Sequence, residues 1–198
     1  MITRPSPSPS GKPTPGPDPS PGPGLPIAAL VHEHGDGADA MVRDFVALQV
    51  RRGLDVQGLL MLHDLARPGK KRCLQDVRSG EVFEIFQDLG EGSHACCLDI
   101  GALVAAGAVL RAAARARPDL VVIDRFGRQE AEGGGFAAEF LALMAEGIPL
   151  LTIVASEFVE DWRRFTGELG VELPMDADRL HEWGAAACVG RTPALARG

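Results

Sequence analysis

The eight residues His32-Glu-His-Gly-Asp-Gly-Ala-Asp39 combine two histidines, two glycines and three carboxylates in one short segment. Parallel sheets commonly bind phosphate in the turn that follows their first strand, which is where this segment lies. A loop of the pattern G-x-x-x-x-G-K-[ST] does so with backbone N–H groups, a lysine that neutralises phosphate and a hydroxyl that holds Mg²⁺. With Gly37 as the second glycine, His32, Ala38 and Asp39 replace the first glycine, the lysine and the hydroxyl.

The three carboxylates of this loop, Glu33, Asp36 and Asp39, oppose a triphosphate. Each close like-charge pair costs on the order of 1 kcal/mol in water, and more when partly buried. We therefore expect no tight, unassisted binding of a nucleoside triphosphate here. The residues of this loop expected to contact a ligand are Gly35, Asp36, Gly37, Ala38 and Asp39.

A second group of charged residues follows the apolar run 120–123. Asp124 would stand at the carboxyl end of a buried strand, where an acid of phosphoryl-transfer proteins helps to hold Mg²⁺. Arg125 and Arg128 could each hold an anion through paired N–H groups. They could equally pair with Glu130 and Glu132, and the spacing leaves both alternatives open.

Histidine and cysteine side chains raise the alternative of a transition-metal site. His32 and His34 lie on one face if their segment is extended, and Asp124 is a further candidate ligand. Other soft or borderline ligands that could converge on them are His63, His94, Cys96 and Cys97. No spacing among them matches a known zinc module, so a polar loop with incidental histidines remains the competing interpretation.

The elements that must position these residues are predicted from hydrophobic periodicity. Apolar runs predict strands over 27–31, 56–62, 120–124, 149–154 and 185–189, and helical spacing predicts helices over 38–52, 100–117, 135–146 and 157–169. Two further strand segments, 73–77 and 81–86, flank Arg78-Ser-Gly80 and predict a β-hairpin. We expect Asp99 to be the N-cap of the helix that follows it. This alternation predicts an α/β fold: three layers, with a mainly parallel sheet and one hairpin insertion.

Composition sets the organisation of the chain. Ten of the 15 prolines fall within residues 1–26, which we expect to be a disordered tail, and residues 27–198 are expected to form a single domain. The net charge of −7 disfavours a nucleic-acid partner, and no apolar run is long enough to span a membrane. Four cysteines form no disulfide framework, so we expect a cytoplasmic protein. A homodimer is compatible with this composition.

The segment Asp124-Arg-Phe-Gly-Arg-Gln-Glu130 resembles the D-E-I-G-x-x-E segment of the small P-loop nucleoside-triphosphatases first known from thermophiles. The resemblance extends to the hairpin at 72–80 and the strand at 149–154. It implies a sheet of P-loop NTPase type in which Asp124 is the magnesium acid, Gly127 the turn glycine and Glu130 the later acid. The family's water-activating glutamate is Arg125 here, so the resemblance implies a scaffold that has lost hydrolysis.

The longer segment 124–135 is also similar to D/N-[KR]-F-G-[KR]-x-E-A-E-G-x-G, and Cys97-Leu-Asp99 to C-x-L-D. Both occur in a bacterial family of degenerate P-loop proteins of undefined function, often found beside molybdenum-transport functions. This resemblance implies a molybdate-related ligand and a transporter or metal-handling partner.

Together these observations predict a non-hydrolytic ligand-binding or regulatory protein. It would bind a small anion such as molybdate, a metal or a nucleotide at the carboxyl ends of the strands, through Asp124, Arg125, Gly127, Arg128 and Glu130 and the loop residues above. One alternative is a residual Mg²⁺-dependent nucleoside-triphosphatase or nucleotide kinase. A further alternative is a partner-binding module with a vestigial site. Magnesium, a transition metal and an oxyanion all stay open as cofactors.

Overall fold

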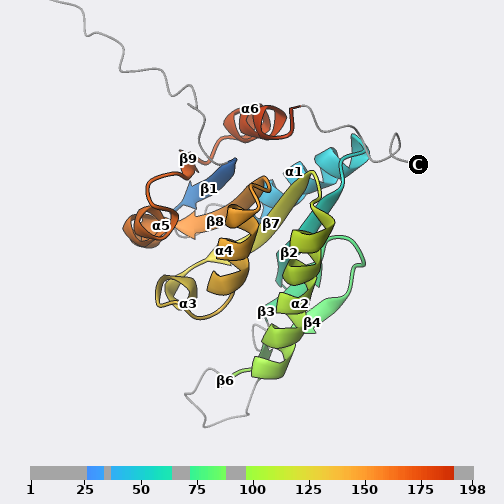
Figure 1. Ribbon diagram of the computed structural model, residues 1–198, viewed down its shortest axis with the longest axis vertical. Helices are drawn as coiled ribbons and strands as arrows, with labels where there is room; N and C mark the ends of the chain where they lie inside the picture. The colour runs from blue at the N-terminus through green and yellow to red at the C-terminus, as the bar shows by residue number, and fades with distance from the viewer. Residues whose placement is uncertain (1–25, 34–36, 64–71, 88–96, 190–198) are drawn as a thin grey trace, which may run out of the picture.

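The computed structural model describes residues 26–33, 37–63, 72–87 and 97–189. Seven strands form one sheet in the order β4-β3-β2-β7-β8-β1-β9 (Figure 1). They are β1 (Ile27–His32), β2 (Val56–His63), β3 (Arg72–Asp76), β4 (Val82–Glu84), β7 (Leu120–Phe126), β8 (Leu150–Ala155) and β9 (Val171–Leu173). The strands from β9 to β2 run parallel, whereas β3 pairs antiparallel with β2 and β4 pairs antiparallel with β3.

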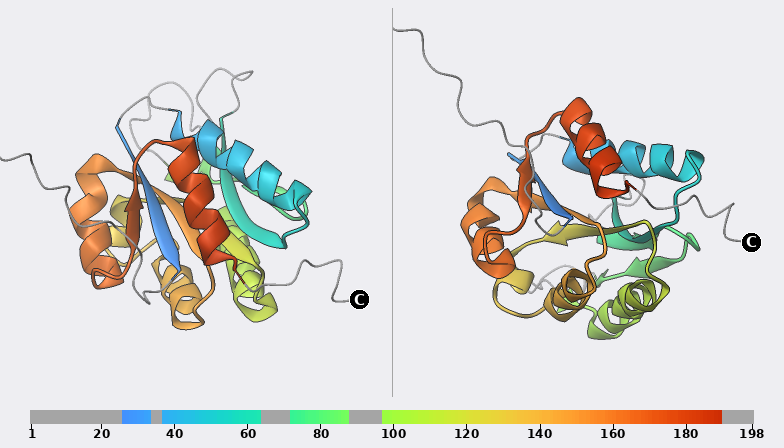
Figure 2. Two further views of the ribbon diagram at one scale, coloured as in Figure 1. Left: turned by 90° about the horizontal axis from the view of Figure 1, so that it is seen from above. Right: turned by 45° about the horizontal axis from the view of Figure 1, so that its top comes forward.

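Helices cover both faces of this sheet, as Figure 2 shows. They are α1 (Ala38–Arg51), α2 (Ile100–Ala116), α3 (Arg128–Ala131), α4 (Ala137–Ala145), η1 (Ser156–Phe158), α5 (Val159–Thr166) and α6 (Ala177–Ala187). α1 and α6 pack on one face, and α2, α4 and α5 on the other. The predicted three-layer α/β fold with a mainly parallel sheet is confirmed.

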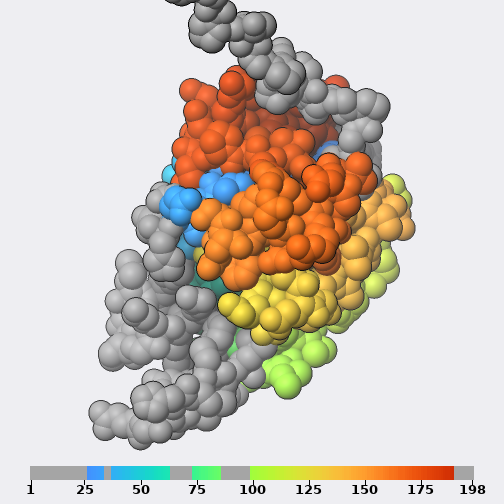
Figure 3. Space-filling view, turned by 90° about the vertical axis from the view of Figure 1, so that its left-hand side faces the viewer, coloured from blue at the N-terminus to red at the C-terminus, as the bar shows by residue number. Residues whose placement is uncertain are grey.

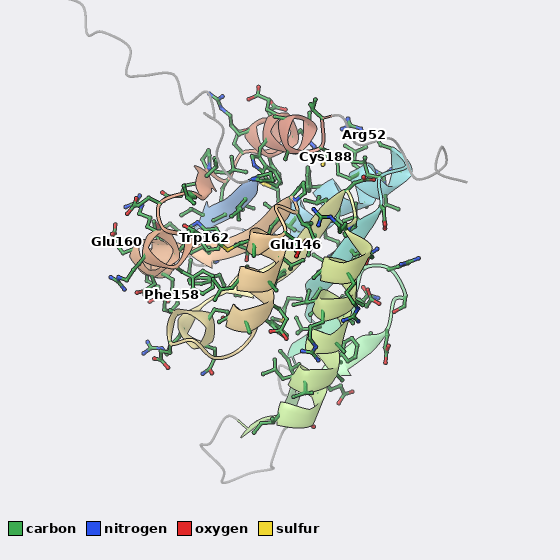
Figure 4. All side chains as sticks on the ribbon, viewed as in Figure 1. Arg52, Glu146, Phe158, Glu160, Trp162 and Cys188 are labelled. Carbon is green, nitrogen blue, oxygen red and sulfur yellow. The ribbon has the colours of Figure 1, made fainter. Side chains whose placement is uncertain are left out.

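Two apolar cores separate the layers, one on each face of the sheet. Phe45 of α1 and Trp183 of α6 belong to the first core, and Phe126, Phe140 and Trp162 to the second. Trp162 is fully buried and points from α5 into the second core, whereas Glu160 of the same helix points away from it (Figure 4). Because successive strand residues point to opposite faces of the sheet, a strand made only of apolar residues contributes side chains to both cores.

Local signals placed several elements correctly. The hairpin around Arg78–Gly80 is confirmed by the antiparallel pairing of β3 with β4. Asp99 accepts a hydrogen bond from the amide of Ala102 at 2.9 Å and is the N-cap of α2, as predicted. The predicted strand over 81–86 is interrupted, because Phe86 begins β5 (Phe86–Gln87), which pairs with β6 (Cys97–Leu98) in a separate two-stranded sheet.

The predicted last strand over 185–189 is wrong. Ala185 to Ala187 end helix α6, which begins at an N-cap, Asp176, whose side chain accepts from two amides. Alanine is the best helix former, and the helical spacing of Leu180 and Trp183 buries one face of α6. The final strand is instead the three-residue β9, which is too short for a periodicity argument to detect.

None of the helices in the described part of the chain is long and apolar enough to cross a membrane.

Candidate functional site

Asp124 and Arg125 lie in an irregularity of β7. Ile123 pairs with Thr152 and Phe126 with Val154. Between these two pairs β7 advances by three residues and β8 by two, so β7 contains one extra residue. The bulge redirects the two charged side chains at the carboxyl edge of the sheet, which is a common use of β-bulges beside functional sites. The Asp124–Arg125 peptide bond is cis.

The carboxylate of Asp124 is buried and tied to the neighbouring strand. Its Oδ2 accepts a hydrogen bond from the backbone amide of Met61 in β2 at 3.0 Å, and its side chain is 1% exposed. This contact lies just beyond the last ladder pair of the two strands, Leu59 with Ile123. The side chain of Asp124 therefore accepts a backbone hydrogen bond from β2 beyond the end of the β2–β7 ladder.

The guanidinium of Arg125 lies between two carboxylates. Its Nη2 donates to Oδ1 of Asp39 at 2.7 Å, and its Nε lies 3.4 Å from Oδ1 of Asp124. The Arg125 side chain is 30% exposed and that of Asp39 19%. The pair joins the first turn of α1 to the end of β7. Of the two alternatives that spacing left open, ion pairing holds for Arg125, but its partners are Asp39 and Asp124 rather than Glu130.

This arrangement does not fit the magnesium ion of a P-loop protein. Such an ion is held between the loop hydroxyl, whose place Asp39 takes, and the strand-end acid, whose place Asp124 takes. Magnesium needs near-octahedral oxygen ligands at about 2.1 Å. Here a guanidinium of fixed charge stands between the two carboxylates, so no step through magnesium follows from these residues.

The beginning of α1 differs from a phosphate-binding loop in a second way. Gly37 has a φ of 77° and is the N-cap residue, without a side chain that could accept from the first-turn N–H groups. Ala38, where the lysine would stand, is 4% exposed and belongs to the core under α1. The position has therefore become part of the core. Asp39 carries the only charge of the first turn.

Glu130 closes the loop that follows β7. Its Oε2 accepts from the amide of Gly127 at 3.0 Å and its Oε1 from the amide of Phe136 at 3.1 Å. Burial raises the pKa of this carboxyl, and the hydrogen bonds from backbone amides partly oppose that rise. A Cβ on Gly135 would lie 2.1 Å from Oε1, so the glycine leaves room for the carboxylate. Glu130 thus acts here as a positioning residue.

The other predicted site residues are distributed more widely. Arg128 is exposed at the start of α3, and Glu132 is exposed after it. His34, Gly35, Asp36, His94 and Cys96 lie outside the described residues; His63 ends β2 and Cys97 begins β6. Within the ranges 26–33, 37–63, 72–87 and 97–189, no three His, Cys, Asp or Glu residues are grouped to hold a metal ion.

Sequence patterns did not predict the contact between Arg125 and Asp39. The available signal was an arginine beside a strand-end acid combined with an acid at the hydroxyl position of the loop. In a P-loop protein these two positions lie close together around one cation. An arginine at one of them and an acid at the other could therefore have indicated an ion pair.

The strand order and the position of α1 define an α/β protein of the P-loop NTPase fold. Two solved structures share it. A human cancer-related nucleoside triphosphatase has a TM-score of 0.60 at 17% identity, covering 84% of this chain and 98% of that one. THEP1 from the hyperthermophile Aquifex aeolicus has a TM-score of 0.58 at 15% identity, covering 81% and 95%. At these identities the likeness shows the fold alone.

The chain belongs to the family described as "Protein of unknown function (DUF2478)", whose sequence profile matches residues 27–183. It is also similar to a molybdenum import ATP-binding protein, ModC 2, of Bradyrhizobium diazoefficiens, at 33% identity over 159 residues. The matched stretch covers 79% of this chain but 18% of that relative.

Proposed function

We propose that this protein binds a nucleotide at the carboxyl ends of β1 and β7 and does not hydrolyse it, acting as a regulatory or ligand-binding member of the P-loop fold. The observation that carries the proposal is Arg125, held between Asp39 and Asp124 at 2.7 and 3.4 Å. Its side chain places a positive charge at the position where a P-loop hydrolase binds Mg²⁺.

The same geometry gives a route for phosphate recognition. An arginine that is 30% exposed can exchange the Asp39 carboxylate for a phosphate oxygen, to which it donates the same charge-assisted hydrogen bonds. The first-turn N–H groups of α1 and its positive dipole end lie at the same edge. Binding would be modest, because lysine and magnesium are both replaced and two carboxylates stay beside the arginine.

The first test is a thermal-shift screen of the full chain with ADP and ATP, each in EDTA and in excess Mg²⁺. A ligand at 100 times its Kd adds about 2.7 kcal/mol, which for a domain of this size corresponds to roughly 5–10 °C in Tm. We expect a shift that does not depend on magnesium. A shift that requires magnesium, or ATP hydrolysis that disappears in Asp124→Asn, would instead support the residual nucleoside-triphosphatase.

A matched pair of variants assigns the effect to the proposed site. Arg125→Ala should lose the nucleotide shift, whereas Arg128→Ala, a change of the same charge three residues away, should keep most of it. Equal loss in both variants would mean that general positive charge is responsible. No shift in the wild type with any nucleotide would favour a partner-binding module with a vestigial site.

The resemblance to a molybdenum import ATP-binding protein favours a second candidate ligand, a molybdate-type oxyanion. It would use Arg125 in the same way as a phosphate group. In the same screen, molybdate and tungstate should then raise Tm more than sulfate at equal concentration. In this proposal the protein works in the cytoplasm beside a transporter or metal-handling partner, and size-exclusion chromatography with light scattering tests for a homodimer.

A further inference from the structure

A second arginine, Arg43, reaches the edge of the sheet that carries Asp124 and Arg125. This edge is formed by the carboxyl ends of the parallel strands, and Figure 3 shows residues of β1 (blue) and of the α3 region (yellow) reaching the surface on that side. Arg43 is exposed and lies in α1, four residues after Asp39. Residues four apart are neighbours on a helix surface, so Asp39 and Arg43 belong to the same face of α1.

The side chain of Arg43 is anchored on β2 by a backbone group. Its Nη2 donates to the carbonyl oxygen of Met61 at 2.9 Å, and the amide of Met61 donates to Oδ2 of Asp124 at 3.0 Å. The amide and the carbonyl of one strand residue point to the same side, which here is the side of β7. The ladder between β2 and β7 ends at Leu59 with Ile123. Arg43 and Asp124 therefore satisfy the two backbone groups of Met61 that the bulged end of β7 does not pair, and the guanidinium lies beside the Asp124 carboxylate.

Most of the Arg43 guanidinium is available to a ligand. A guanidinium has five N–H donors. Among the described residues, the acceptor that Arg43 contacts is the carbonyl of Met61, which takes one of them. Because the Arg43 side chain is exposed, the other donors can reach a bound anion. Arg125 differs, because the structure already directs its N–H groups to Asp39 and Asp124.

The charges at this edge also favour a role for Arg43. Arg125 lies between Asp39 and Asp124, so two carboxylates surround one guanidinium and leave one negative charge in excess. That excess repels an incoming anion. The charge of Arg43 balances it, since the two arginines then match the two carboxylates. An anion that takes the place of Asp39 on Arg125 would thus have a second cation beside it.

We propose that Arg43 and Arg125 together bind two linked phosphates, so that the site selects a diphosphate over a single tetrahedral oxyanion such as phosphate or molybdate. The inference rests on the proposed function, because Arg125 must exchange Asp39 for the ligand. Neighbouring strands lie about 4.8 Å apart, and Arg43 reaches the end of β2 whereas Arg125 belongs to the end of β7. Two phosphoryl groups joined by one oxygen can span this spacing, each bound by the paired N–H groups of one guanidinium.

The test is equilibrium binding of ADP, pyrophosphate and inorganic phosphate to the full chain in EDTA. Pyrophosphate should bind at least roughly tenfold more tightly than phosphate, as expected for added hydrogen bonds between charged groups. Arg43→Met keeps a long unbranched side chain without the guanidinium. It should lose most of the preference for pyrophosphate and bind phosphate almost as the wild type does, whereas Arg125→Ala should weaken the binding of both anions.

Two further variants make the assignment specific. Arg52→Met removes the same charge at the opposite end of α1, where Figure 4 labels this residue, and should bind all three ligands like the wild type. Arg43→Lys keeps a charge and a donor for the Met61 carbonyl but not the planar pair of donors, so it should retain part of the preference. Circular dichroism establishes that each variant is folded, and Arg43→Lys supplies the comparison if Arg43→Met does not fold.

The outcomes separate this proposal from the proposed function. Equal loss of phosphate and pyrophosphate binding in Arg43→Met would mean that Arg43 only positions Asp124 through Met61, and would overturn the proposal. An unchanged preference in Arg43→Met, with both anions lost in Arg125→Ala, would overturn it and leave the proposed function standing. A lost preference in Arg43→Met, with Arg125→Ala binding like the wild type, would support Arg43 and overturn the proposed function. Absence of binding by the wild type would overturn both.

Discussion

Nη2 of Arg125 donates to Oδ1 of Asp39 at 2.7 Å across 86 positions of sequence. The contact connects the first turn of α1 with the bulged end of β7, although β8 separates β1 from β7 in the sheet. In a P-loop enzyme a bound Mg²⁺ supplies the positive charge at this position. Here the guanidinium of Arg125 supplies it. This pair, the strand-end acid and the loop that follows it can each be tested by substitution.

Arg125→Ala should destabilise the protein by about 1–3 kcal/mol. Breaking a fully buried ion pair costs about 3–5 kcal/mol, and the 30% exposure of Arg125 lowers that figure through solvent screening. The variant removes the guanidinium between Asp39 and Asp124, so Mg²⁺ should stabilise it while leaving the wild type unchanged. Urea unfolding with and without Mg²⁺ measures both effects. An equal response of Arg128→Ala to Mg²⁺ would show that the ion acts elsewhere.

Asp124→Ala should cost about 1–3 kcal/mol, because it removes the acceptor that the structure gives to the buried amide of Met61. Asp124→Asn retains an oxygen that can accept from that amide and should cost less. Urea unfolding of the two variants compares the costs directly. If they were equal, the contact from Met61 to Oδ2 would not be the structural role of Asp124.

Gly135→Ala should be clearly more destabilising than Gly133→Ala. Both glycines have positive φ, 53° and 82°, so both substitutions bear a left-handed backbone penalty of about 1–2 kcal/mol. Only at Gly135 does the new Cβ meet Oε1 of Glu130; at Gly133 no heavy atom of the described residues lies within 4 Å. Displacing that carboxylate would weaken or break the two hydrogen bonds that it accepts from backbone amides. Chemical denaturation should therefore separate the variants by at least about 1 kcal/mol, and indistinguishable midpoints would contradict the role of Glu130.

Stability should depend on pH through Glu130. Its folded pKa is raised, with burial as the main cause. Between the unfolded value of about 4.3 and the folded pKa, the native state binds more protons than the unfolded state. The free energy of unfolding contributed by Glu130 is therefore greatest at low pH and decreases as pH rises through that window.

Glu130→Gln isolates this contribution, because other titrating groups are common to both proteins. The stability of the wild type relative to the variant should decrease with rising pH and become constant above the folded pKa. Urea titrations across roughly pH 4–8 provide the comparison. A difference that grows with pH would mean that the folded pKa of Glu130 is lowered rather than raised.

The sequence by itself determined the local helices and strands and showed which residues of a P-loop hydrolase are replaced. Apolar runs predicted β1, β7 and β8, and Asp99 predicted the start of α2, because short-range packing and capping decide such features. The absence of a lysine at Ala38 and of a carboxylate at Arg125 is likewise visible in the letters alone.

Only the tertiary structure decided which charges meet. Glu130 is nearer to Arg125 in sequence than Asp39 is, yet it binds the amides of its own loop. Parallel strands bring their carboxyl ends to one edge, so the strand order sets the distance between Asp39 and Arg125. The same order places the short β9 beside β1, where its three residues pair with the edge that β1 offers them.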